Sequence, residues 1–123
     1  MYKSVIIADD SMFMRNLLKS YLSTSFYQVV AEASNGCEAV SLYKKYSPDV
    51  LLLDLTMPCK DGLAALKEIM EYNPKANVII CSAMGQKSLI IDAVSLGAKD
   101  FIIKPNFHKL IPALHHLFQY NNL

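Results

Sequence analysis

The sequence predicts an α/β fold, a five-stranded parallel sheet that is doubly wound, with five helices covering its two faces. Two observations support this prediction. Short apolar segments alternate along the chain with longer segments whose apolar residues recur every three or four positions, a pattern typical of alternating strands and helices. The segment Val50–Leu53 is apolar at every position, as expected for a parallel strand buried on both faces.

The predicted strands are the short apolar segments, and several of them end at a charged residue or a turn. The first ends at two aspartates, and the third ends at Asp54. In order along the chain, the five strands are Lys3–Ala8, Tyr27–Ala33, Asp49–Leu53, Asn77–Ala83 and Asp100–Lys104.

The predicted helices follow these strands one by one, and their ends carry ordinary start and stop signals. Ser11 can cap the first helix, Asn35-Gly36 breaks the chain before the second, and Gly97 is well placed just past the end of the fourth. Pro112 would disrupt the interior of the last helix, so this helix either starts late or is kinked near its start. The five helices are Ser11–Leu22, Cys37–Tyr46, Gly62–Tyr72, Gln86–Leu96 and His108–Tyr120, followed by a tail at 121–123.

The composition indicates one globular domain that spans residues 1–123. The chain is 53% hydrophobic and 19% charged, and its formal net charge is +1. This balance gives no electrostatic attraction for nucleic acid, and no apolar run approaches the roughly 20 residues of a membrane span. The N-terminus lacks the pattern of a secretory signal. We therefore expect a cytoplasmic protein with no direct nucleic-acid contact and no membrane insertion.

The cysteines and histidines predict no metal site of their own. Cys37, Cys59 and Cys81 are widely spaced and form no CxxC pair, which argues against a disulfide framework and against a zinc site. Cys81 lies in a predicted strand and is expected to be a buried apolar filler, whereas Cys59 is expected to be an exposed loop thiol. The three histidines near the C-terminus are expected at solvated helix positions.

The chemistry of the sequence is concentrated where the predicted strands end. Parallel α/β sheets bind ligands beyond the carboxyl ends of their strands. The residues at these ends are three carboxylates, one hydroxyl and one ammonium group: Asp9, Asp10, Asp54, Ser82 and Lys104, with Thr56 behind Asp54. Each of them alone could be a helix cap, a turn residue or a solvated loop residue, except Asp54, which directly follows the most apolar strand and has no adjacent helix to cap. Together, they predict a functional site at one edge of the sheet.

The charges at this edge favour a magnesium site that handles phosphate. Asp9, Asp10 and Asp54 would repel one another at close range, and a hard cation with oxygen ligands relieves that repulsion. Lys104 adds a positive charge suited to a phosphoryl group, and Ser82 can donate a hydrogen bond to a phosphoryl oxygen. A carboxylate can itself accept a phosphoryl group and become an aspartyl phosphate.

Four motifs make the chain resemble the receiver domains of two-component response regulators, in particular the CheY-like, single-domain chemotaxis regulators. The motifs are "IIADDSMFMR", "VLLLDLTMPCKDG", "VIICSA" and "FIIKP", and the resemblance runs from Val5 to about Phe118. It implies the flavodoxin-like strand order 2-1-3-4-5. It also implies a histidine kinase or phosphotransfer protein as the phosphoryl donor and a downstream effector, such as a chemotaxis or motor protein, as the target.

The resemblance assigns a role to each matching position. Asp54 would be the phosphoacceptor, a signalling group rather than part of a conventional enzyme, although the domain would catalyse its own phosphotransfer and dephosphorylation. Asp10, Asp54 and the backbone carbonyl of Thr56 would bind Mg²⁺, with Asp9 acting through a water molecule. Lys104 would pair with the phosphoryl group. Ser82 would bond that group and form the switch together with Phe101.

Further expectations concern the phosphoryl lifetime and the output surface. Thr56 and Met84 lie two residues beyond Asp54 and Ser82, where the family varies and tunes the lifetime of the phosphoryl group. Phe101 replaces the tyrosine that is common in chemotaxis members. The helix Gln86–Leu96 has more apolar residues than one core-facing stripe needs. Either it is broadly buried, or Ile90 faces outward beside Phe101 as part of a partner site.

Other functions fit the residues less well. A phosphatase of the haloacid dehalogenase type needs a second acid two residues after Asp54, and Thr56 stands there. A flavin-binding module needs a hydroxyl- and glycine-rich loop after the first strand, and "ADDSMFM" contains no glycine. A pseudo-receiver that only binds partners would not need the full acid set. The open alternative is a receiver fragment, or a stand-alone regulator of another pathway such as a transcriptional phosphorelay.

Overall fold

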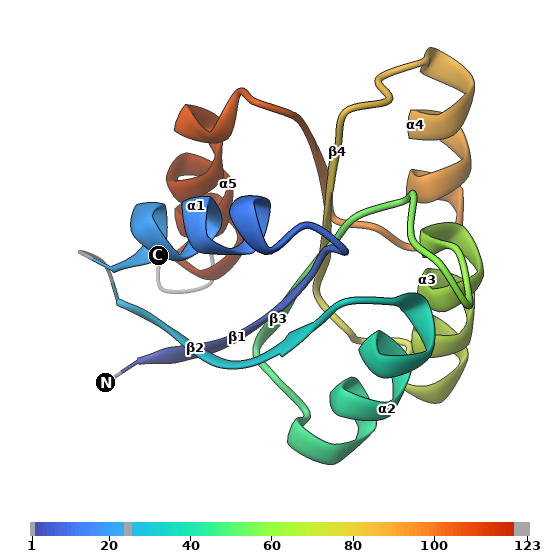
Figure 1. The fold of residues 1–123 in the computed structure, drawn as a ribbon, viewed down its shortest axis with the longest axis horizontal. Helices are drawn as coiled ribbons and strands as arrows, with labels where there is room; N and C mark the ends of the chain where they lie inside the picture. The colour runs from blue at the N-terminus through green and yellow to red at the C-terminus, as the bar shows by residue number, and fades with distance from the viewer. Residues whose placement is uncertain (1, 24–25, 120–123) are drawn as a thin grey trace.

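The five strands form one parallel sheet in the order β2-β1-β3-β4-β5, as expected (Figure 1). The structure is a computed structural model that describes residues 2–23 and 26–119. The strands are β1 (Lys3–Ala8), β2 (Tyr27–Ala33), β3 (Val50–Leu53), β4 (Val78–Ser82) and β5 (Asp100–Ile103). β3 is buried along its whole length at the centre of the sheet, which confirms the reading of its continuous apolar run.

The helices cover both faces of the sheet. α1 and α5 lie on one face, whereas α2, α3 and α4 follow one another along the other side (Figure 1). No helix within the described residues is long and apolar enough to cross a membrane. The bounds are α1 (Met12–Leu22), α2 (Gly36–Tyr46), α3 (Gly62–Tyr72), α4 (Lys87–Ser95) and α5 (Leu110–Gln119), with a short 3-10 helix η1 (Phe107–Lys109) before α5.

The helix caps explain why three helices begin where they do. The side chains of Ser11, Asn35 and Asp61 accept hydrogen bonds from backbone N–H groups in the first turns of α1, α2 and α3. Gly97, with a φ of 116°, follows α4 in a left-handed conformation that favours glycine, as the sequence predicts.

The last helix starts late. Its predicted start at His108 falls inside the 3-10 helix η1, and α5 itself begins at Leu110. Pro112 therefore lies in the first turn of α5, where a backbone N–H has no partner within the helix and its loss costs little. Tyr120, the predicted end of this helix, and the predicted tail lie outside the described residues.

The sheet separates two apolar cores. Alternate strand residues point to opposite faces, so each strand contributes to both cores. The core under α2, α3 and α4 contains Ile6, Leu51, Leu53, Leu66, Ile69, Val78 and Ile80. The core under α1 and α5 contains Val5, Ile7, Leu18, Val50, Leu52, Ile79, Phe107 and Leu114.

The prediction against a disulfide is wrong, because Cys37 and Cys59 are bonded to each other. Their Cα atoms lie 6.1 Å apart, within the range that a disulfide spans. The fold pairs them by placing the first turn of α2 against the loop between β3 and α3. Cys81 is buried, as expected, and burial raises the pKa of its thiol to about 12.

Candidate functional site

The end of β1 holds Asp9 in a fixed position. Its backbone N–H donates to the carbonyl of Ala33 in β2, 3.0 Å away, and its carbonyl accepts a hydrogen bond of 2.7 Å from Arg15. Its carboxylate accepts a hydrogen bond of 2.9 Å from the N–H of Ser11, the cap of α1. Asp9 is buried and Asp10 beside it is exposed. The two neighbouring carboxylates therefore have different environments.

The end of β3 holds Asp54 equally firmly. Its N–H donates to the carbonyl of Ala8, 2.9 Å away, which ties β3 to β1 just before the aspartates. A side chain at Gly62 would collide with this strand end, because its Cβ would lie 2.3 Å from the carbonyl oxygen of Asp54. The absence of that side chain lets α3 start directly against the strand. Asp54 is therefore buried in a rigid setting rather than carried on a free loop.

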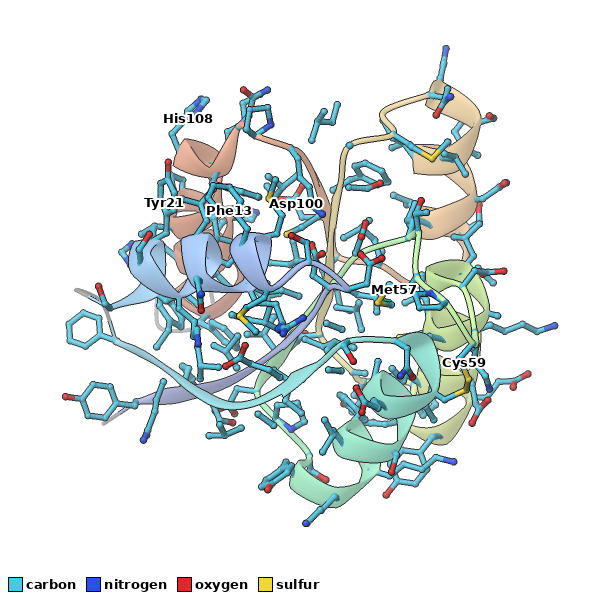
Figure 2. All side chains as sticks on the ribbon, in the orientation of Figure 1. Phe13, Tyr21, Met57, Cys59, Asp100 and His108 are labelled. Carbon is cyan, nitrogen blue, oxygen red and sulfur yellow. A yellow bond between two sulfur atoms is a disulfide. The ribbon has the colours of Figure 1, made fainter. Side chains whose placement is uncertain are left out.

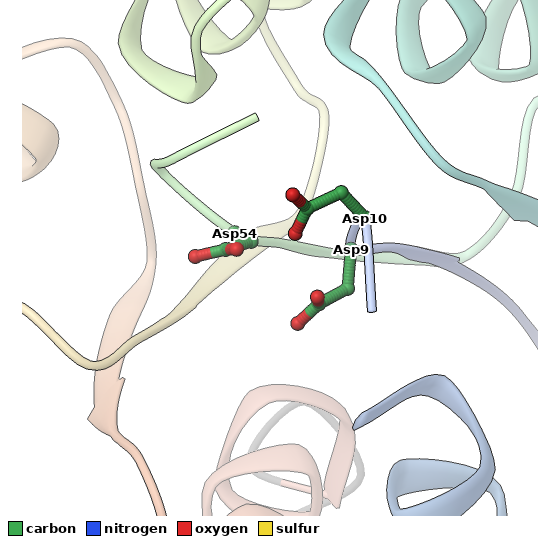
Figure 3. A group of neighbouring side chains, drawn as sticks. All are labelled: Asp9, Asp10 and Asp54. Carbon is green, nitrogen blue, oxygen red and sulfur yellow. The ribbon is translucent and has the colours of Figure 1, made fainter. Parts of the chain in front are cut away.

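Three carboxylates meet at this edge of the sheet (Figure 3). One oxygen from each of Asp9, Asp10 and Asp54 can be chosen so that all three lie within 4.8 Å of one another. Three oxygen ligands of high negative charge, part buried and part exposed, suit a hard divalent cation that keeps some of its water. The residues present therefore fit Mg²⁺.

Lys104 brings the positive charge into the same place. Its backbone N–H donates to the carbonyl of Ser82, 2.9 Å away, where β5 pairs with β4. Its Nζ lies 2.5 Å from a carboxylate oxygen of Asp9 and 3.5 Å from one of Asp54. The ammonium group thus lies beside both buried carboxylates and partly offsets their repulsion.

The electrostatics of the site are dominated by burial. Burial raises the pKa of Asp54 above its ordinary value and outweighs the positive charge of Lys104, which lowers that pKa. Burial alone would lower the pKa of Lys104, but the hydrogen bond to Asp9 and the charge of Asp54 outweigh it, so the pKa of Lys104 is raised. At neutral pH the lysine stays a cation beside the carboxylates.

Ser82, Thr56 and Met84 lie at the ends of β3 and β4. Ser82 is buried at the last position of β4, and its hydroxyl accepts a hydrogen bond of 3.1 Å from the N–H of Met84. The Thr56 hydroxyl donates to the sulfur of Met84, 3.5 Å away. Both side chains are exposed. The two residues expected to influence the phosphoryl lifetime thus contact each other at the surface of the site.

The residues predicted for the output surface lie on α4 and β5. Phe101 is half-buried and packs against the core under α2, α3 and α4. Ile90 is also half-buried, whereas its neighbours Ile91 and Val94 are 52% and 53% exposed. α4 is therefore not broadly buried, and its most exposed apolar positions lie beside Ile90 rather than at it.

Sequence reasoning assigned no role to Arg15 or Gly62. Arg15 holds the carbonyl of Asp9 and also pairs with Glu32 of β2 at 3.0 Å, so it ties α1 and β2 to the site. A signal for Arg15 was present, since it lies one turn beyond the cap of the helix that follows the aspartates. Gly62 gave no such signal, because only the packing of α3 on β3 shows why a side chain is excluded.

Comparison with known proteins identifies the arrangement. The family model for the response regulator receiver domain matches residues 5–115. The chain belongs to this family. Receiver domains are the phosphoacceptors of two-component signalling. The resemblance inferred from the four sequence motifs is thereby confirmed.

Individual relatives of this receiver domain are chemotaxis regulators. The chain is 52% identical over 101 residues to the chemotaxis protein CheY of Bacillus subtilis strain 168, covering 82% of this chain and 84% of that protein. It is 50% identical over 105 residues to the chemotaxis protein CheY of Thermotoga maritima, covering 85% and 88%.

A solved structure shares both the fold and part of the sequence of this receiver domain. It is the CheX–CheY–BeF3–Mg²⁺ complex from Borrelia burgdorferi, which matches with a TM-score of 0.91 at 36% identity. The match covers 94% of this chain and 89% of that one. The doubly wound fold and its strand order are therefore those of solved receiver domains.

Proposed function

We propose that this receiver domain is a phosphorylation switch in which Asp54 accepts a phosphoryl group from a histidine kinase or phosphotransfer protein, with Mg²⁺. The observation that carries the proposal is the setting of Asp54. Its carboxylate is buried at the end of a rigid strand, beside Asp9 and Asp10 and 3.5 Å from the Lys104 ammonium group. Phosphoryl transfer depends on such positioning and charge neutralisation more than on covalent machinery.

The transfer requires one new bond and one broken bond. A carboxylate oxygen of Asp54 attacks the phosphorus, the P–N bond to the donor histidine breaks, and that histidine regains a proton. Asp9, Asp10, Asp54 and the Thr56 carbonyl would hold Mg²⁺, which neutralises charge on the phosphoryl oxygens. Lys104 would stay paired to the group after transfer, because its raised pKa keeps it charged.

The switch would run from Ser82 to Phe101. A phosphoryl group on Asp54 would offer its oxygens to the Ser82 hydroxyl, which the N–H of Met84 now contacts. Movement of Ser82 toward Asp54 would free space for Phe101 to turn further inward. The result would be a shift between two states that changes the surface of α4 and β5.

The downstream partner is proposed to be an effector protein of chemotaxis, such as a motor protein. Two relatives at about half identity are named chemotaxis proteins, and a structural relative was solved in a complex named CheX–CheY. Neither observation was made on this chain, so the effector is a proposal by similarity.

Phosphorylation of Asp54 can be tested directly. Incubation with acetyl phosphate and Mg²⁺ should add one phosphoryl group to the wild-type chain, detected by intact mass and located by peptide mapping. Asp54→Asn should lose the modification. Asp61→Asn is the matched control, because Asp61 caps α3 in the same loop and asparagine caps helices equally well. Modification of Asp54→Asn at the wild-type level would contradict the proposal.

The output surface can be tested without knowing the effector. Addition of beryllofluoride and Mg²⁺, which mimic the phosphoryl state, should shift the backbone amide signals of Ile90 and Phe101 in NMR spectra. Tyr46, at the far end of α2, is the control position and should shift little. Unchanged signals at both Ile90 and Phe101, with the signal of Asp54 shifted, would place the output elsewhere.

A further inference from the structure

The Cys37–Cys59 disulfide lies beside the phosphoacceptor loop and is open to solvent. Cys37 is in the first turn of α2, and Cys59 is in the loop between β3 and α3 (Figure 2). Both residues are exposed, so a small thiol can reach either sulfur atom. Exposed disulfides are the ones that exchange readily and serve in regulation. Cys81, by contrast, is buried and its pKa is raised to about 12, so it takes no part.

One end of the disulfide belongs to the loop that starts at Asp54. This loop contains Thr56 and reaches Cys59, whose φ of 70° lies in the left-handed region that non-glycine residues rarely adopt. Within the loop, the N–H of Lys60 donates to the carbonyl of Pro58 at 2.8 Å, and the side chains of Leu55 and Met57 are buried in the core under α2, α3 and α4. The link to Cys37 adds a covalent tie at the exposed part of the loop, where Pro58 and Cys59 lie.

The other end of the disulfide belongs to the segment that fixes Asp9. Ala33, whose carbonyl accepts the hydrogen bond from the Asp9 N–H, lies just before the turn into α2. The start of α2 also touches the loop directly, since the Gly36 N–H donates to the Pro58 carbonyl at 3.4 Å. A Cβ at Gly36 would lie 1.8 Å from the carbonyl oxygen of Lys60. The disulfide thus joins the start of α2 to the loop that follows Asp54.

We propose that Cys37–Cys59 is a redox modification site that sets the Mg²⁺ affinity of the receiver: the disulfide form binds Mg²⁺ more tightly than the dithiol form. The physical reason is that the disulfide holds the loop carrying Thr56 against α2, so fewer conformations must be given up when the metal binds. This inference rests on the proposed metal site. The substrate class for the modification is a small or protein dithiol, which reduces the bond, and the matching disulfide, which restores it.

The exchange balances in two steps. A thiolate of the dithiol attacks Sγ of Cys59, forms a mixed disulfide, and displaces Cys37 as a thiolate, which then takes up a proton. The second thiol of the reductant, after losing its proton, attacks the mixed disulfide, releases Cys59 as a thiol, and leaves as a cyclic disulfide. Cys37 is the favoured leaving group because it lies at the N-terminus of α2, where the helix dipole stabilises an anion.

The first experiment asks whether the bond is open to exchange in the folded protein. The native chain is treated with dithiothreitol at neutral pH, alkylated, and mapped by mass spectrometry. Cys37 and Cys59 should be labelled together, while Cys81 should be labelled only after denaturation. Failure to label Cys37 and Cys59 in the folded protein would overturn the proposal, because a regulator must reach the bond.

The second experiment measures Mg²⁺ affinity in both states by calorimetric titration with MgCl₂ alone. Coupling between two sites typically changes affinity about fivefold or more, and a loss of that size is expected on reduction. The double variant Cys37→Ser, Cys59→Ser should bind Mg²⁺ with the affinity of the reduced chain, and dithiothreitol should not change that affinity. Cys81→Ala is the matched control and should keep the full response to reduction.

The reduction potential of the disulfide gives an independent measurement, because Mg²⁺ binding and reduction are thermodynamically linked. If Mg²⁺ prefers the disulfide form, saturating Mg²⁺ must disfavour reduction by the same factor. A fivefold change corresponds to a shift of about 20 mV toward more negative potential in a dithiothreitol redox titration. Equal Mg²⁺ affinity in both states would overturn the coupling and leave the proposed function intact. Absence of Mg²⁺ binding in both states would overturn the metal site and, with it, this inference.

Discussion

The residue proposed to accept the phosphoryl group is buried, and its burial reduces the stability of the fold. Asp54 is buried, and the buried carboxylate is less favourable in its charged form than a solvated one. Lys104 offsets only part of that cost, since the pKa of Asp54 remains raised above its ordinary value. An ionised, poorly solvated oxygen is a good nucleophile for phosphorus. The same burial that would prepare Asp54 for the proposed transfer therefore weakens the fold.

Because the buried charge of Asp54 reduces stability, we expect Asp54→Asn to be more stable than the wild type by an amount that depends on pH. The folded chain holds the Asp54 proton more tightly than the unfolded chain does. The contribution of Asp54 to stability is thus fully present below its ordinary pKa of 3.8 and is lost as the pH rises through the higher folded value. In chelator at neutral pH, Asp54→Asn should raise Tm by a few degrees, the shift produced by about 1 kcal/mol.

Thermal unfolding, monitored by circular dichroism, measures the rise in Tm of Asp54→Asn over the wild type across the pH range. The gain in Tm should shrink as the pH falls through the raised folded pKa of Asp54, because the wild-type carboxylate then takes up its proton. Asp61→Asn, at an exposed cap, should show no such trend. A Tm for Asp54→Asn at or below that of the wild type at neutral pH would contradict the account.

At the scale of elements, the junction of β3 and α3 decides where the site forms. The helix begins at Gly62, and the Gly62 N–H donates to the carbonyl of Leu55 at 2.8 Å. A Cβ there would lie 2.3 Å from the Asp54 carbonyl oxygen and 2.4 Å from the Leu55 Cα. Backbone atoms of a buried strand cannot move aside cheaply. The strand end and the helix start thus form one rigid unit.

Gly62→Ala should accordingly weaken both the fold and the site. Overpacking of this kind typically destabilises a protein by about 1–3 kcal/mol, and the displaced strand end should also reduce Mg²⁺ affinity. Gly85→Ala is the matched control, because the atoms nearest to its added Cβ belong to the Ile103 side chain rather than to backbone. Urea unfolding compares the two variants. Equal stability of Gly62→Ala and the wild type would show that the junction tolerates movement.

The elements themselves were largely predictable, because their signals are local. The cap at Ser11, the break before α2 at Asn35-Gly36 and the glycine after α4, Gly97, lie where the sequence indicates them. The gathering of the carboxylates was predictable too, since parallel strands end at the same edge. The Cys37–Cys59 bond was not, because it depends on how α2 packs beside a loop distant in sequence. The same holds for the 3-10 helix before α5, whose start depends on packing of Phe107.

At the scale of the whole molecule, Mg²⁺ binding should raise the stability of the entire fold. The proposed ligands come from the ends of β1 and β3, which pair with each other at the centre of the sheet. Unfolding separates them and destroys the site. A ligand that binds only the folded chain stabilises it by about 2.7 kcal/mol at a concentration 100 times its Kd.

Differential scanning calorimetry should show Tm rising with Mg²⁺ concentration in the wild type. Asp10→Asn should remove most of this rise, because it takes one charged ligand from the cluster. Asp92→Asn, an equal change of charge at an exposed position on α4, should leave the rise unchanged. A Tm independent of Mg²⁺ in the wild type would contradict the assignment of the site.

Because the two cores lie on opposite faces of the sheet, the residues of one core can change during evolution without changes in the other. Neighbouring residues such as Leu52 and Leu53 belong to different cores, so they answer to different sets of contacts. A substitution in the core under α1 and α5 can be compensated only by residues on that face. The changes in unfolding free energy caused by substitutions on opposite faces should therefore add. Descendants of this chain can therefore rework one set of helices for new partners while the other set stays as inherited. Only the strand ends where both halves meet are bound to change together.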